Sequence, residues 1–150
     1  MLALSPTPSP ADDEHKNPVR LWRFLRRTVS SGVLWHSRAV VSYLSPMVDN
    51  VLRSEMEQRL RRCFGQRFRA AVFYGSRALG REGPGSDLDL LVVLDGPIRL
   101  WADTHRAVVS LYDVQLGLDY PIHVIPVEKD SYDAGEYSLY RHAKIEASVA

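Results

Sequence analysis

The residues best suited to chemistry are two aspartates, Asp87 and Asp89, at the start of an apolar stretch that runs to Leu94. Successive side chains of a β-strand point to opposite faces, so a strand here places both carboxylates on one face. Neighbouring carboxylates repel each other unless a proton or a cation lies between them. Because oxygen ligands suit Mg²⁺, the spacing predicts a magnesium site formed by Asp87 and Asp89.

A candidate phosphate-binding turn precedes the aspartates. The apolar run of Val72 and Phe73 stops at Gly75 and Ser76, where a short helix is expected to begin. Such a turn offers free main-chain N–H groups, the positive end of the helix dipole and a hydroxyl group to a phosphate. A phosphate-binding turn beside metal-binding carboxylates is the combination used in phosphoryl and nucleotidyl transfer.

The elements that must position these residues follow from hydrophobic periodicity and turn residues. A helix is expected to start at Asp49, as its N-cap, and to end at Phe64, before Gly65. The expected strands cover residues 69–74, 86–95 and 122–127. Further helices are expected over residues 99–114 and 136–147, with a polar turn after Glu128.

The motif around the aspartates resembles a known family. Gly75-Ser76-Arg77-Ala78-Leu79-Gly80 and Ser86-Asp87-Leu88-Asp89-Leu90 look like the signature of the nucleotidyltransferase superfamily related to DNA polymerase beta. They are most similar to the minimal nucleotidyltransferase (MNT) domains found beside HEPN proteins in bacterial and archaeal toxin–antitoxin pairs. The resemblance covers roughly residues 48–147. It implies an α/β (α+β) fold in which helices flank a small mixed β-sheet.

The resemblance also implies roles for individual residues. Asp87 and Asp89 would be catalytic and would bind Mg²⁺, and the substrate would be ATP or another NTP. Nucleotide binding would fall to four further residues, Gly75, Ser76, Arg77 and Ser86. For Arg77, an ion pair that braces the loop is an equally good interpretation.

The chain departs from the family pattern at a third carboxylate, which the family supplies from a later strand. Aligning the acidic turn at residues 128–130 with that of the family places His123 in this position. Neutral imidazole is a poor Mg²⁺ ligand, but it titrates near neutral pH and suits a general base. His123 is therefore a candidate catalytic base for the acceptor hydroxyl. Asp119 is an alternative, although it lies four residues earlier, roughly 13 Å along an extended chain.

Two functions remain open at this point. In the first, the protein transfers AMP to a hydroxyl of a partner protein, which by resemblance is a HEPN ribonuclease toxin. In the second, it is a catalytically degenerate antitoxin or interaction module that acts by binding alone. A weaker third idea is a nucleotide-binding regulator that works through a basic N-terminal helix.

Composition narrows the function classes further. The chain has 150 residues, a net charge of +1, a single cysteine and 45% hydrophobic residues. Direct nucleic-acid binding is not expected from this charge, and an internal disulfide is impossible with one cysteine. A membrane span and a leader peptide are not expected either, so the sequence predicts a cytoplasmic protein.

Three segments are expected from the pattern of Pro, Ser and charged residues. Residues 1–18 are expected to be a disordered tail, 19–46 a basic helical extension and 47–150 the nucleotidyltransferase domain. The extension contains an apolar stripe with basic residues beside it, which suits docking on the domain or a partner, or contact with lipid or RNA. We also hypothesise that Met47 is the native start and that residues 1–46 are not part of the native protein.

Overall fold

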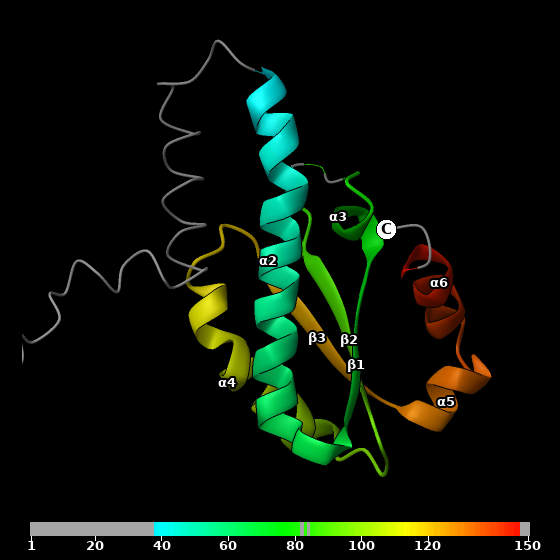
Figure 1. Ribbon diagram of the computed structural model, residues 1–150. Helices are drawn as coiled ribbons and strands as arrows, with labels where there is room; N and C mark the ends of the chain where they lie inside the picture. The colour runs from blue at the N-terminus through cyan, green and yellow to red at the C-terminus, as the bar shows by residue number, and fades with distance from the viewer. Residues whose placement is uncertain (1–37, 82, 84, 148–150) are drawn as a thin grey trace, which may run out of the picture. The chain divides into compact units, whose positions relative to one another are not determined.

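The structure is a computed structural model that describes residues 38–81, 83 and 85–147 (Figure 1). The chain divides between Glu55 and Met56 into two units. The described residues of the first unit, 38–55, are all helical and belong to α2 (Arg38–Phe64). The predictions for the tail and for residues 19–37 lie outside the described residues.

The prediction that a helix begins at Asp49 is wrong. The helix α2 begins at Arg38, so Ser45 and Pro46 lie inside it. A residue inside a helix already has its main-chain N–H in the helical hydrogen-bond pattern and does not act as a cap. The predicted end of this helix at Phe64 is confirmed, and Gly65 follows with a φ of 55°.

The second unit contains the end of α2, a three-stranded sheet and the helices around it. In chain order its elements after α2 are η1 (Gly65–Arg67), β1 (Phe68–Tyr74), α3 (Gly75–Ala78), β2 (Leu88–Leu94), α4 (Leu100–Gln115), β3 (Ile122–Glu128), α5 (Lys129–Ala134) and α6 (Ser138–Ala147). The strand order is β1-β2-β3. The strands β1 and β2 are antiparallel and β2 and β3 are parallel, so the predicted small mixed sheet is confirmed.

Helices cover both faces of this sheet. In Figure 1, α4 lies on one side of the strands and α5 and α6 lie on the other. The central strand β2 is almost wholly buried between these layers, which explains why its residues are apolar on both faces.

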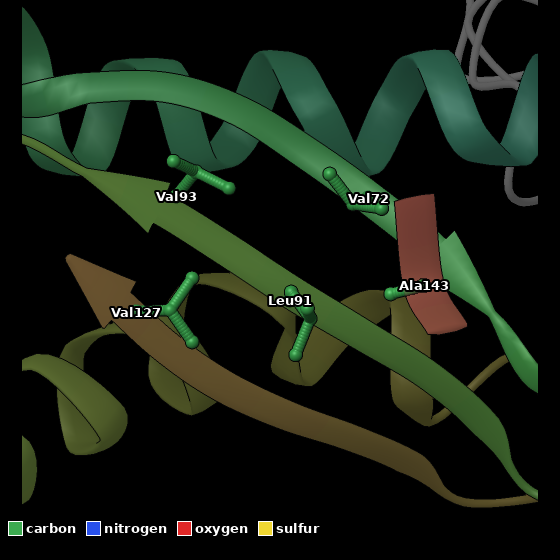
Figure 2. Packing of buried hydrophobic residues seen from close by; sticks show 5 residues of the cluster. All are labelled: Val72, Leu91, Val93, Val127 and Ala143. Atoms are coloured by element: carbon green, nitrogen blue, oxygen red, sulfur yellow. The ribbon is translucent and has the colours of Figure 1, made fainter. Parts of the chain in front are cut away.

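One face of the sheet forms a compact core with α6. Figure 2 shows side chains of β1, β2 and β3 gathered beside Ala143 of α6: Val72, Leu91, Val93 and Val127. Ala143 itself is fully buried. This contact fixes α6 on the face of the sheet to which the odd-numbered residues of β2 point.

The segment after β3 differs from its prediction. Instead of a polar turn, residues Lys129–Ala134 form the short helix α5. Gly135, in the left-handed conformation with φ 64°, ends α5, and α6 starts later than expected, at Ser138. A left-handed glycine is a common way to stop a helix, and here it separates two short helices where one turn and one helix were predicted.

No helix among residues 38–81 and 85–147 has the length and apolar character needed to cross a membrane.

Candidate active site

The strand register brings the predicted catalytic residues to one end of the sheet. Asp89 of β2 pairs with Tyr74 of β1 and with His123 of β3. These three positions lie in alternation with the buried residues Val72 and Leu91, so their side chains are on the face covered by α6. Asp87 precedes β2 by one residue and is half-buried.

Asp89 and His123 are direct neighbours. Nδ1 of His123 lies 3.7 Å from Oδ1 of Asp89, and the side chains are 70% and 29% exposed respectively. The imidazole is thus open to a group from another molecule, whereas the carboxylate is held closer to the protein. The predicted placement of His123 beside the aspartates agrees with this geometry.

The surroundings of Asp89 oppose its ionisation, chiefly because the carboxyl group is partly buried. Partial burial raises the pKa of Asp89; His123 acts to lower it, while the negative charges of Asp87 and Glu146 raise it further. Burial also raises the pKa of Tyr74, as do the charges of Asp89 and Glu146. A cation beside Asp89 would relieve this repulsion.

Gly75 is required by its conformation and by its neighbour. Its φ is 81°, which side chains rarely adopt, and a Cβ atom built on it would lie 2.5 Å from Oδ2 of Asp89. Its main-chain N–H donates a hydrogen bond to Oε2 of Glu146, at 2.7 Å. The Gly75 turn therefore packs against the carboxylate of Asp89, a candidate metal ligand. Its amide donates a hydrogen bond to a second carboxylate, that of Glu146.

Arg77 fastens the loop between α3 and β2. Its Nε and Nη2 donate to the main-chain carbonyl of Ser86, at 3.1 and 2.9 Å. Its guanidinium also lies 3.6 Å from the centre of the Tyr120 ring, just before β3. Arg77 thus braces two segments. Its hydrogen bonds to the Ser86 carbonyl hold the segment before Asp87, and its contact with the Tyr120 ring holds the segment before His123.

The remaining predicted residues lie around this loop. Ser86 accepts a hydrogen bond on its hydroxyl from the Gly83 N–H, at 2.9 Å, and so closes a tight turn. Ser76 is exposed in the first turn of α3. Asp119 is exposed in the loop that follows α4, and its proposed role as a substitute carboxylate stays a prediction.

Glu146 lies at the site, although it was not predicted from the sequence. The predicted terminal helix covers residues 136–147, and Glu146 was not among its candidate site residues. Leu139, Ala143 and Glu146 are spaced i, i+4, i+7, which also places Glu146 on the buried side of the helix. This spacing was the available signal.

The donor set suits a divalent metal that is shared with a substrate. Among the described residues, no three His, Cys, Asp or Glu side chains form a group able to hold a metal ion on their own. Mg²⁺ is commonly held by one or two carboxylates together with substrate phosphates and water. Two mutually repelling carboxylates beside a turn with an anion-binding amide fit that arrangement.

Comparison with protein families gives a match to the nucleotidyltransferase domain (NTP_transf_2) over residues 53–145. This range contains every residue of the predicted site. Searches of curated proteins and of solved structures gave no significant match. The family model covers more than half of the chain and all three strands, and on this ground the chain belongs to the nucleotidyltransferase domain family.

Proposed function

We propose that this protein transfers AMP from ATP to a hydroxyl group of a partner protein, and that the partner is a HEPN-type ribonuclease toxin which it neutralises. Membership of the nucleotidyltransferase family implies a nucleoside triphosphate substrate. The observation that carries the proposal is the position of Asp89, which lies against the Gly75 turn on one side and His123 on the other.

Each residue of the site has a defined task in this proposal. Asp87 and Asp89 would hold Mg²⁺, whose charge would neutralise the phosphates. The Gly75 N–H would donate to a phosphate oxygen, as it donates to a carboxylate in the structure. The hydroxyl of the next residue, Ser76, would donate a further hydrogen bond to the phosphate. Arg77 and Ser86 keep the loop closed around these groups.

The chemical step transfers a nucleotidyl group. The acceptor oxygen attacks the α-phosphorus, the bond from that phosphorus to the β-phosphate bridging oxygen breaks, and pyrophosphate leaves. His123 takes the proton of the acceptor hydroxyl. Positioning and charge neutralisation supply most of the rate enhancement in such reactions.

A macromolecular acceptor suits the exposure of the site. The His123 side chain is 70% exposed, so its imidazole is reachable by a hydroxyl on the surface of another protein. The HEPN partner is favoured by the resemblance of the motif at residues 75–90 to MNT domains. A tyrosine hydroxyl of the toxin is the acceptor that this resemblance implies.

A second function is favoured by one specific observation. An imidazole, and not a carboxylate, stands in register with Asp89 in β3. If this replacement has removed catalysis, the protein is an antitoxin that silences its partner by binding alone.

Transfer of label from α-labelled ATP to the co-purified partner, in the presence of Mg²⁺, decides between the two. The test variant carries Asp87→Asn and Asp89→Asn. The control variant carries Asp113→Asn and Asp130→Asn, which remove two exposed charges away from the site. Label that is lost only in the test variant supports AMP transfer. A partner that stays unlabelled, bound and inactive with the wild-type protein refutes transfer and supports binding alone.

A further inference from the structure

The amide of the Gly75 turn is occupied by a side chain of the protein itself. Oε2 of Glu146 accepts a hydrogen bond from the Gly75 N–H at 2.7 Å. This short distance is typical of a strong hydrogen bond to a charged acceptor. Glu146 comes from α6, 71 residues further along the chain. A main-chain N–H has one hydrogen, so a phosphate oxygen and the Glu146 carboxylate compete for it.

The position of Glu146 is set by a packed helix. Ala143, three residues earlier and on the same side of α6, is fully buried against the sheet (Figure 2). Side-chain hydrogen bonds tie α6 to the chain before it: Arg141 Nη1 donates to the Gly135 carbonyl at 2.6 Å, and Lys144 Nζ donates to the Asp133 carbonyl at 2.8 Å. The carboxylate is therefore presented to Gly75 by a fixed element of the fold.

The charge of Glu146 also acts against a nucleotide. Glu146 and Asp89 both lie against Gly75, and the charge of Glu146 acts on Asp89 and on Tyr74. A triphosphate adds further negative charge at the same place. Repulsion from Glu146 therefore opposes phosphate binding in addition to the competition for the amide.

We propose that Glu146 is an internal competitor of the nucleotide phosphate, which occupies the Gly75 amide in the free protein and must leave it when nucleotide binds. This inference rests on the proposed function, because it assumes that the Gly75 turn receives the phosphates of an NTP. In this role Glu146 restrains the site: it lowers nucleotide affinity, because phosphate binding must first displace its carboxylate from the Gly75 amide.

The test is a calorimetric titration of the full chain with ATP and Mg²⁺. Glu146→Gln removes the charge and keeps the shape, and Glu146→Ala removes the acceptor while retaining helix propensity. Loss of one hydrogen bond to a charged group corresponds to about a tenfold or greater change in affinity, so Glu146→Ala is expected to bind ATP at least about tenfold more tightly. Glu146→Gln retains a neutral acceptor oxygen, so it is expected to bind ATP more tightly than the wild type but less tightly than Glu146→Ala. Glu136→Gln, which removes an exposed charge before α6, is the matched control and is expected to bind as the wild type does.

The outcomes separate the inference from the proposed function. Tighter binding by both Glu146 variants supports the inference. Equal or weaker binding by them overturns it and leaves the proposed function standing. If neither wild-type nor variant protein binds ATP, the proposed function fails, and the inference fails with it. The Gly75 amide resonance gives a readout without nucleotide: it should shift in Glu146→Ala, and an unchanged resonance in a folded variant also overturns the inference.

Discussion

His123 lies directly opposite Asp89 in the parallel pair of β2 and β3, with its Nδ1 3.7 Å from the Asp89 Oδ1. The family to which the motif is similar supplies a carboxylate from this part of the sheet. In this chain an imidazole lies beside Asp89 in place of that carboxylate. In the proposed reaction, Asp87 and Asp89 would hold the metal and His123 would take the proton of the acceptor hydroxyl.

Replacement of His123 tests that assignment. His123→Ala is expected to lower kcat for AMP transfer by at least about 10²-fold with little change in ATP affinity, because general-base catalysis contributes about 10² to 10⁴-fold. His123→Asp is expected to have a higher kcat than His123→Ala, since it provides a carboxylate base at the same position. His105→Ala, an exposed histidine on α4, serves as the control. A His123→Ala enzyme with unchanged kcat would contradict the role.

Gly75 and Gly80 form a natural pair for testing the turn. Both have positive φ, 81° and 64°, but only a Cβ on Gly75 would collide with Asp89. Each alanine substitution should cost about 1–3 kcal/mol from backbone strain, and Gly75→Ala should cost more because Asp89 must move. Urea unfolding of the two variants measures this difference. Equal losses of stability would show that the Asp89 side chain can move away from the new Cβ without lowering the free energy of unfolding.

The Gly75 and Gly80 variants should also differ in nucleotide binding. Displacement of Asp89 removes a proposed metal ligand, so Gly75→Ala is expected to lose Mg²⁺-dependent ATP binding. Gly80→Ala is expected to retain it, because the space around Gly80 is open within 4 Å.

Arg77 is expected to stabilise the loop between α3 and β2 through the shape of its guanidinium group and not through its charge alone. Arg77→Lys keeps the charge but loses the paired hydrogen bonds to Ser86 and the flat contact with Tyr120. We expect about 1–2 kcal/mol of lost stability and faster hydrogen exchange at Leu88, where the loop enters β2. Arg81→Lys, at an exposed position in the same loop, is the control. Unchanged exchange in Arg77→Lys would mean that the loop holds its shape without this brace.

Most of the sheet could be predicted from the sequence because its signals are local. The apolar run after Asp87 and the glycine at residue 75 define β2 and the end of β1 by composition alone. The position of His123 beside Asp89 followed from aligning the acidic turn with that of the family, and the observed register agrees. These features depend on neighbours in sequence or on a motif.

The features that were missed depend on contacts between distant segments. Glu146 reaches Gly75 across 71 residues, and no local pattern states that a helix end meets that turn. The start of α2 was misplaced because Asp is a common N-cap residue, which points to Asp49 as the cap, yet the helix runs from Arg38 through this position. Asp103 looks like an ordinary surface residue of a helix start, but it is fully buried by its partner Arg67.

The Arg67–Asp103 pair is expected to be a main support of the second unit. Nη1 and Nη2 of Arg67 donate to the two carboxylate oxygens of Asp103, at 3.0 and 3.1 Å, and the Arg99 N–H donates to Oδ2 at 2.9 Å. Removing one member leaves the other charge buried without its partner. Arg67→Met is therefore expected to cost about 3–5 kcal/mol in urea unfolding at pH 7.

The same pair predicts how stability changes with pH. Burial acts to raise the pKa of Asp103, but hydrogen bonds from Arg67 and the Arg99 N–H outweigh it and leave the pKa lowered. A carboxyl group with a lowered pKa in the folded state stabilises the fold above its unfolded pKa of about 3.9, and this contribution is lost as pH falls through the folded pKa. The stability difference between wild type and Asp103→Asn should therefore be largest at neutral pH and shrink below about pH 4. Urea unfolding across this range measures it, and a difference independent of pH would show that the ionised carboxylate is not the stabilising form.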